Sequence, residues 1–191
     1  MKKLLFLIFL SMLVFGSGGV ALATEYHNYF PSADSSVIGT PGMIDSDEFG
    51  YFSSQLNGDS IIETFTGTGL QNVYQLDLDF DVTRNYLSSG ASIDWDVFVE
   101  GVKVGDWSWD ENDGTGPVSL SYSFPDIVGN GNYVIAMLVS NDVPFNAGSI
   151  ALGFPGELTL TGAPVPEPAT MLLLGSGLFG LAGFRKKFRK K

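Results

Sequence analysis

The sequence predicts an all-β protein whose body is a two-sheet sandwich of the jelly-roll-like kind. Between Thr24 and Gly162 no stretch has helical periodicity, whereas short alternating or continuous apolar runs recur. Turn signals separate these runs at Asn57-Gly58, Asp113-Gly114 and Gly129-Asn130-Gly131. About eight strands in roughly 140 residues favour two packed sheets, because the exposed aromatic edges of one open sheet would aggregate.

The clearest strand signal is the segment VYQLDLDFDV, in which apolar and acidic residues alternate. Tyr74, Leu76, Leu78, Phe80 and Val82 are predicted to share one face, with three aspartates on the other. The remaining predicted strands, in chain order, span residues 60–66, 92–99, 102–109, 117–124, 133–139, 149–154 and 157–161. The fully apolar run 133–139 predicts a central strand that is buried on both faces. Residues 25–51 allow either an ordered first strand with long loops or a partly flexible arm.

Charge is distributed very unevenly along the 191 residues. Apart from the two ends, the chain has only Arg84 and Lys103 as basic residues, against 21 acidic ones between Glu25 and Glu167, so this middle part has a net charge of −19. Such a body is repelled by nucleic acid and by anionic lipid, which excludes nucleic-acid binding. The chain has no Cys, which leaves the redox compartment open.

Residues 1–23 have the three parts of a secretory signal peptide. Two lysines precede the apolar run Leu4–Phe15, and Ala21-Leu22-Ala23 supplies the small-residue cleavage pattern. Signal peptidase is therefore expected to cut between Ala23 and Thr24. An uncleaved anchor is the alternative, but the run gives only about 18 Å of helix, short of the roughly 30 Å hydrocarbon core.

Residues 163–191 combine a proline-braced tripeptide, an apolar segment and a basic tail. The tripeptide is Pro166-Glu167-Pro168, held extended by its prolines. The uncharged segment 169–184 gives about 24 Å of helix, enough to span a membrane with snorkelling neighbours. The positive-inside rule places the basic tail in the cytoplasm and the body outside. The tail consists of Arg185, Lys186, Lys187, Arg189, Lys190 and Lys191.

This order of tripeptide, apolar helix and basic tail resembles the PEP-CTERM sorting domain. The resemblance implies recognition and cleavage by exosortase, so that the protein would be recovered without the peptide after Glu167. It also implies a Gram-negative bacterium that makes exopolysaccharide, with a transient stay in the inner membrane and delivery to the cell surface or extracellular matrix. The alternative is an ordinary C-terminal anchor on a proline-rich stalk.

The body also has a family resemblance, although no single motif defines it. Residues 73–161 look like the jelly-roll domains of carbohydrate-binding modules and of PEP-CTERM proteins. This resemblance implies a domain that binds carbohydrate. The body is then expected to extend over residues 24–162, between the signal peptide and the sorting signal.

Two clusters of acidic residues are candidate calcium sites. On one strand, alternate aspartates lie about 7 Å apart, so several of them chelate one ion only with help from a neighbouring strand. A second cluster in a turn has part of the pattern of a calcium loop, without its downstream Glu. The alternative is a solvated acidic surface. The candidates are Asp77, Asp79 and Asp81 with Asp94 and Asp96 on an adjacent strand, and Asp110 with Asn112 in the turn.

Trp107 and Trp109 are candidates for sugar binding, because alternate residues of a strand share a face and an exposed indole offers a platform for a sugar ring. Packing in the core and contact with another protein are the alternatives for this pair. Trp95 alternates with aspartates and is expected in the core.

No catalytic residues are predicted. His27 is the only histidine, the chain has no Cys, and there is no G-x-S-x-G motif, so a serine or cysteine hydrolase has little to build with. We therefore expect an exported, exosortase-processed protein, not an enzyme, whose sandwich binds exopolysaccharide or has a structural role there. The alternatives are a glycoside hydrolase, which needs two carboxylates about 5 to 9 Å apart, and a surface coat or adhesion protein with a protein partner.

Overall fold

The computed structural model describes residues 23–30, 36–38, 48–52, 60–141, 148, 150–153 and 156–165. These residues form only strands and the turns between them, and they include no helix long and apolar enough to span a membrane. The predicted membrane helix at 169–184 and the signal peptide lie outside the described residues. The strands are β1 (Thr24–Phe30), β2 (Ser36–Ile38), β3 (Glu48–Phe52), β4 (Ser60–Thr66), β5 (Leu70–Asn85), β6 (Ser92–Val99), β7 (Val102–Asp110), β8 (Gly116–Val128), β9 (Asn132–Val139), β10 (Ile150–Gly153) and β11 (Gly156–Pro164).

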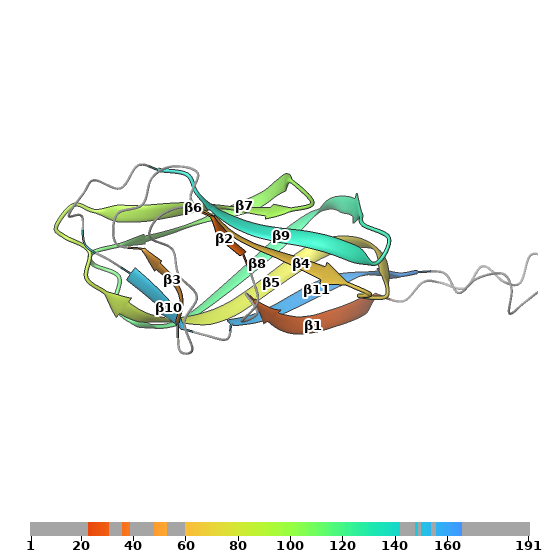
Figure 1. Cartoon of the computed structure of the whole chain (residues 1–191), viewed down its shortest axis with the longest axis horizontal. Helices are drawn as coiled ribbons and strands as arrows, with labels where there is room; N and C mark the ends of the chain where they lie inside the picture. Colours follow the sequence, from red (N-terminus) through yellow and green to blue (C-terminus); the bar gives the residue numbers. More distant parts are fainter. Residues whose placement is uncertain are drawn as a thin grey trace, which may run out of the picture.

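The strands form two antiparallel sheets that pack face to face (Figure 1). In the first sheet the order is β1-β11-β5-β8. The short β10 pairs with the C-terminal end of β5, on the same side as β11 but beyond it, and β3 pairs with β10. The second sheet has the order β2-β4-β9-β6-β7. The chain therefore crosses between the sheets from β4 to β5, from β5 to β6, from β7 to β8 and from β8 to β9, while β6 and β7 form a hairpin within the second sheet. Repeated crossing between two packed antiparallel sheets is typical of a jelly roll. The predicted two-sheet jelly-roll-like fold is confirmed.

The core lies between the sheets and consists of the inward half of each alternating strand. Leu76, Leu78 and Val82 of β5 face Val97 and Val99 of β6 across this core, and all five are at most 1 % exposed. Burial of so many aliphatic and aromatic side chains is the main force that holds the two sheets together.

A tyrosine closes each open edge of the sandwich. On one side Tyr26 of β1 meets Phe65 of β4 edge to face, with ring centroids 6.0 Å apart. On the other side Tyr122 of β8 reaches across to β7 and donates a hydrogen bond to the carbonyl oxygen of Asp106 over 3.0 Å. Gly105 makes room for this ring, because a Cβ there would lie 2.1 Å from two of its carbon atoms.

Two turns depend on residues with left-handed backbone conformation. Glu100 and Gly101 have φ angles of 51° and 74°, and Asn130 and Gly131 have φ angles of 51° and 92°. Positive φ at both central residues is the signature of the type I′ turn, whose twist suits antiparallel strands. The turn predicted at 129–131 is confirmed. The turn at 100–101 sets the register of β6 with β7, whereas the turn at 129–131 leads from β8 of the first sheet to β9 of the second.

The strand predictions need three corrections. Tyr74 does not point into the core: a bulge in β5 leaves it and Gln75 partly exposed between the buried Val73 and Leu76. The run 133–139 is central in its sheet, but its outward side chains are only half-buried. Finally, β1 shows that residues 24–30 are an ordered strand paired with β11, in favour of the first of the two alternatives.

Candidate functional site

The outward side of the first sheet is polar from one edge to the other, and we call it the polar face. The side chains come from β1, β11, β5 and β8, where residues that alternate with the core point to the outside. Carboxylates, hydroxyls, one imidazole and one phenol make up most of it. The polar face consists of Glu25, His27, Tyr29, Gln75, Asp77, Asp79, Ser119, Ser121, Ser123, Glu157, Thr159 and Thr161.

Strand register places four of these residues in one row across the sheet. His27 is opposite Thr159, Thr159 is opposite Asp77, and Asp77 is opposite Ser121. At each end of the row a hydrogen bond joins two neighbours. His27 Nδ1 lies 2.9 Å from Thr159 Oγ1, and Ser121 Oγ donates to Asp77 Oδ1 over 2.5 Å. The row therefore places hydrogen-bond donors and acceptors side by side on four neighbouring strands, and such groups can recognise hydroxyl-rich ligands.

A pocket of about 370 Å³ lies at the β1 end of the polar face. It is lined by His27, Asn28, Tyr29, Glu157, Leu158 and Thr159. Tyr29 is 55 % exposed, so an aromatic ring stands at the border of the pocket with its surface open to solvent. Glu157 is the one carboxylate in its lining, whereas glycoside cleavage generally uses two.

The three alternate aspartates of β5, Asp77, Asp79 and Asp81, form an acidic ladder on the outward side of the first sheet. Its first member, Asp77, already accepts hydrogen bonds at both carboxylate oxygens, since Gln75 Nε2 donates to them over 3.1 and 2.9 Å and Ser121 donates to one. Asp79 and Asp81 are exposed. The ladder thus has one carboxylate that is occupied by the protein and two that face solvent.

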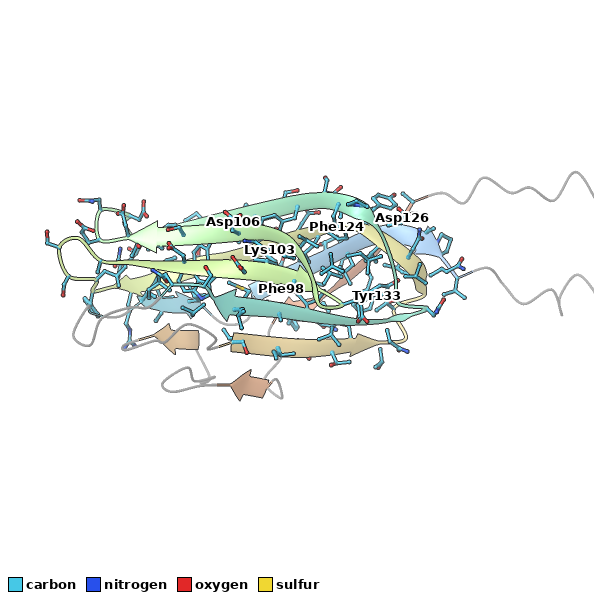
Figure 2. The ribbon with its side chains drawn as sticks, turned by 90° about the horizontal axis from the view of Figure 1, so that it is seen from above. Phe98, Lys103, Asp106, Phe124, Asp126 and Tyr133 are labelled. Carbon is cyan, nitrogen blue, oxygen red and sulfur yellow. The ribbon has the colours of Figure 1, made fainter. Side chains whose placement is uncertain are left out.

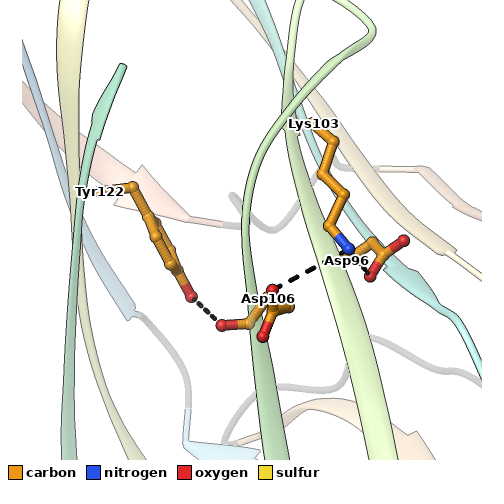
Figure 3. Close-up of polar contacts among 4 residues, drawn as sticks. All are labelled: Asp96, Lys103, Asp106 and Tyr122. Atoms are coloured by element: carbon orange, nitrogen blue, oxygen red, sulfur yellow. Dashed lines mark hydrogen bonds and ion pairs between the residues drawn. The ribbon is translucent and has the colours of Figure 1, made fainter.

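Asp94 and Asp96 are not on a strand adjacent to this ladder. They belong to β6, which pairs with β9 and β7 in the second sheet, so the sandwich core separates them from Asp77. Asp94 accepts a hydrogen bond from Ser108, and Asp96 forms an ion pair with Lys103 Nζ over 2.7 Å (Figure 3). The hydrogen bond to Asp96 raises the pKa of Lys103 above its ordinary value.

The turn at 110–114 is closed by hydrogen bonds among its own residues. Asp110 Oδ1 accepts from the backbone N–H of Asn112 over 2.7 Å, and Asp113 Oδ2 accepts from the N–H of Asp110 over 2.8 Å. Asn85 donates to the carbonyl oxygen of Asp110 over 2.8 Å and secures the turn against β5. These reciprocal bonds use the oxygens that a calcium loop would direct at the ion.

The structure therefore does not bring the predicted calcium ligands together. Across the part of the chain that is described, no three His, Asp or Glu side chains gather closely enough to hold a metal ion. The condition set by the sequence, that the two acidic strands be neighbours, is not met, because β5 and β6 lie in different sheets.

The tryptophan pair is part of the core and not a platform for sugar. Trp107 is 8 % exposed and stacks on Trp95 with ring centroids 4.2 Å apart and an angle of 19° between the planes. Phe80 of the opposite sheet meets Trp107 edge to face at 5.2 Å. Trp109 is half-buried against this cluster. The prediction that Trp95 is in the core is confirmed, and the sugar-binding alternative for Trp107 is wrong because its ring points inward.

The outward side of the second sheet differs from the polar face, and we call it the apolar face. On β4, β9 and part of β6 it has half-buried aliphatic and aromatic side chains. On β6 and β7 polar pairs lie beside them, namely Asp94 with Ser108 and Asp96 with Lys103. Figure 2 shows Phe98 and Lys103 on this side of the molecule. The apolar face consists of Ile62, Phe98, Val134, Ala136 and Leu138.

Most of the polar face was not found by sequence reasoning. His27 was noticed only as the single histidine, and Tyr29, Thr159 and Ser121 were not singled out. Serine at every second position of 119–123 was the available signal, because such alternation marks one exposed face of a strand. The approach of β1 to β11, which are more than a hundred residues apart, has no local signature.

The C-terminal part of the chain matches a known sorting signal. Residues 164–187 carry a PEP-CTERM protein-sorting motif. The match includes the predicted tripeptide Pro166-Glu167-Pro168 and the first basic residues of the tail, so the predicted resemblance to a PEP-CTERM sorting domain is confirmed. The motif marks an exported protein that is processed at the membrane. No curated protein matches the chain.

Several solved structures have a similar sandwich. One is the CBM36-1 domain of a multidomain xylanase from the hindgut metagenome of Trinervitermes trinervoides, with 19 % identity and a TM-score of 0.42, covering 74 % of this chain and 100 % of that domain. Another is a carbohydrate-binding module CBM36 in complex with calcium and xylotriose, with 15 % identity, a TM-score of 0.41 and coverages of 73 % and 99 %. The Agl-KA catalytic domain has 16 % identity, a TM-score of 0.43 and coverages of 77 % and 29 %. At these identities and scores the likenesses support no functional conclusion for this chain.

Proposed function

We propose that this protein is delivered by its sorting signal to the cell surface or extracellular matrix of a Gram-negative bacterium, where the polar face binds exopolysaccharide. The observation that carries the proposal is the position of the sorting motif, which continues directly from β11, the last strand of the sandwich. A folded body on such a signal is exposed to the polysaccharide outside the cell after export.

The chemistry of the polar face supports a glycan as its ligand. Hydroxyls of Thr159 and Ser121, the imidazole of His27 and the carboxylate of Asp77 form a row that can donate to and accept from sugar hydroxyls. Tyr29 adds an exposed ring, on which the apolar side of a sugar can stack.

Charge limits the kind of polysaccharide. The part of the chain between the signal peptide and the basic tail has a net charge of −19, and carboxylates lie within the polar face itself. An anionic chain would be repelled at this surface at low ionic strength unless cations bridge the two. We therefore expect either a neutral polysaccharide, bound without a metal ion, or an acidic one bound through Ca²⁺ shared between the polymer and the exposed Asp79 and Asp81.

The test is to measure binding of the processed protein, purified from culture, to exopolysaccharide of the producing organism, in calcium and then in chelator. Tyr29→Ala should weaken binding roughly tenfold, as expected for an aromatic anchor. Tyr86→Ala is the matched control, because Tyr86 is a similarly exposed tyrosine outside the polar face. Loss of binding in chelator would favour cation bridging, and retained binding would favour a neutral ligand. Equal binding by both variants and the wild type would contradict the polar face as the site.

The apolar face favours a second candidate function, that of a coat or adhesion protein with a protein partner. Half-exposed side chains such as Phe98 and Leu138 are typical of the central part of protein interfaces. If this function is correct, Phe98→Ser abolishes retention of the protein on cells that lack exopolysaccharide, whereas Tyr29→Ala has no effect.

Glycoside cleavage remains the enzymatic alternative, with Glu157 as the carboxylate of the pocket. It predicts the release of new reducing ends when the protein is incubated with exopolysaccharide, and their loss in Glu157→Gln. A binding protein leaves the polymer length unchanged.

A further inference from the structure

The sorting motif begins inside the folded sandwich. Its first residue, Pro164, is also the last residue of β11 and is paired with Leu70 of β5. The next residue, Val165, donates its backbone N–H to the carbonyl oxygen of Gly69 over 2.8 Å. The start of the motif is thus held in place by the fold.

Hydrogen bonds make this end of the sandwich rigid. Thr68 lies in the loop that holds Val165, is 8 % exposed, and donates its N–H to the carbonyl oxygen of Gly131 over 3.0 Å. The fully buried Tyr133 donates its hydroxyl to the carbonyl oxygen of Leu70 over 3.2 Å. We call this end the exit pole and define it as the loop 67–69, the turn 129–131, Val128 and Val165.

The sequence leaves little distance between the exit pole and the apolar segment of the motif. Residues 166–168 alone separate Val165 from Ala169, where the segment begins. An extended chain spans at most about 3.5 Å per residue, so Ala169 lies within roughly 14 Å of Val165. When the apolar segment is in the membrane, the exit pole must therefore be close to the membrane surface, at the place where the motif is processed.

The surface of the exit pole has exposed apolar groups. Val128 and Val165 are 61 % and 44 % exposed. The strand that carries Val128 and the strand that leads into Val165 lie on either side of β5. Val128 of β8 and Ala163 of β11 are both opposite Asn72, so Val128 and Ala163 are two strand spacings, or about 10 Å, apart. Asp126 lies beside them and accepts a hydrogen bond from Asn72 Nδ2 over 2.6 Å, and Figure 2 shows it at this end of the molecule.

We propose that the exit pole is a docking surface for the membrane-embedded enzyme that processes the sorting motif, so that this enzyme recognises the tripeptide together with the folded end of the sandwich. The proposal rests on processing of the sorting motif and is independent of glycan binding. Asp126 and the net charge of −19 disfavour contact with anionic lipid head groups, which leaves a protein surface as the partner that fits these valines.

The first experiment separates the motif from the exit pole in the full-length protein. A flexible Gly-Ser spacer of about twelve residues, followed by a second Ala-Pro-Val, is inserted between Val165 and Pro166. The tripeptide then keeps its neighbours but lies at an r.m.s. distance of about 20 Å from the pole. The cleaved fraction is measured by intact mass and immunoblot in sorting-competent cells. We expect cleavage of the spacer variant to fall at least roughly fivefold.

The second experiment changes the surface of the exit pole without changing the motif. Val128→Lys is expected to lower the cleaved fraction roughly fivefold to tenfold, whereas Tyr86→Lys, a control at a similarly exposed residue away from the pole, leaves it unchanged. Equal thermal midpoints of the two variants show that folding is not the cause of the difference.

A cross-link identifies the partner directly. The chain has no Cys, so Val128→Cys introduces a single thiol that a benzophenone maleimide labels in cells. We expect an adduct with the processing enzyme from position 128 and none from Tyr86→Cys. An adduct with lipid alone would overturn the proposal and assign the pole to the membrane. Full cleavage of both the spacer variant and Val128→Lys would overturn docking. An uncleaved wild-type protein would overturn processing of the motif itself, without any bearing on glycan binding.

Discussion

The two outer faces of the sandwich are built on the same core but differ in chemistry: β9 in the middle of the second sheet has apolar outward side chains, whereas β5 in the middle of the first sheet has acidic ones. On the first sheet, Asp77 and Ser121 alternate with buried aliphatic residues, and their hydrogen bonds cross the strands. On the second sheet, Val134 and Leu138 of β9 alternate with buried residues in the same way, yet they are apolar. Core packing determines the inward-pointing residues of a strand, whereas the outward-pointing residues can be suited to whatever each face binds. The difference between the faces is therefore the strongest indication of function that the body offers.

Both faces depend on one aromatic cluster, and its loss should have the largest effect. Trp95 is fully buried and stacks on Trp107, which in turn contacts Phe80 of the other sheet. Trp95→Ala should lower the free energy of unfolding by about 3–5 kcal/mol, an amount comparable with the whole stability of many domains. Urea denaturation checks this, with Tyr86→Ala as an exposed control. A loss below about 1 kcal/mol would mean that the faces are held together in another way.

High pH should weaken the edge at which the two sheets meet. Burial raises the pKa of Tyr122 to about 12, with a further contribution from Asp106. In the unfolded chain this hydroxyl ionises near pH 10, so the folded state keeps a proton that the unfolded state loses. The contribution of Tyr122 to stability should be constant below pH 10 and be lost between pH 10 and 12. The loss should be smaller than the roughly 2–3 kcal/mol that two pKa units represent, because solvent screens a half-exposed ring. Tyr122→Phe should flatten the decline in chemical denaturation, and an unchanged slope would contradict the assignment.

Matched substitutions on the two faces compare them directly. Leu138→Ser on the apolar face removes half-buried aliphatic surface and should cost about 1–2 kcal/mol. Asp79→Ser on the polar face removes an exposed charge between two others and should change stability by less than about 0.5 kcal/mol. Thermal midpoints of the two variants report the difference. Equal effects would show that the faces do not differ in the way their residues suggest.

The ion pair beside the apolar face should contribute least. Lys103 is exposed and pairs with Asp96 at the surface, where water and salt screen the attraction. Lys103→Met should leave the thermal midpoint unchanged within error at physiological salt. A clear destabilisation that is greater at low salt than at high salt would show that the pair holds the β6–β7 hairpin.

Local patterns were sufficient for the fold and insufficient for the site. Alternation in β5 and β6 predicted strands and the residues 129–131 predicted a turn, because each signal lies within a few neighbouring residues. The polar face combines β1 with β11, and which strands become neighbours depends on packing of the whole chain. The error at Trp107 has the same origin, since alternation groups residues by face without stating which face is buried.

The most direct test of the central claim is hydroxyl-radical footprinting of the processed protein with and without exopolysaccharide of the producing organism. If the polar face binds the polymer, Tyr29 and His27 should be protected from oxidation, while Phe98 and Leu138 on the apolar face should react as they do in the free protein. Protection of Phe98 and Leu138, with Tyr29 unchanged, would contradict the account and place the ligand on the opposite sheet.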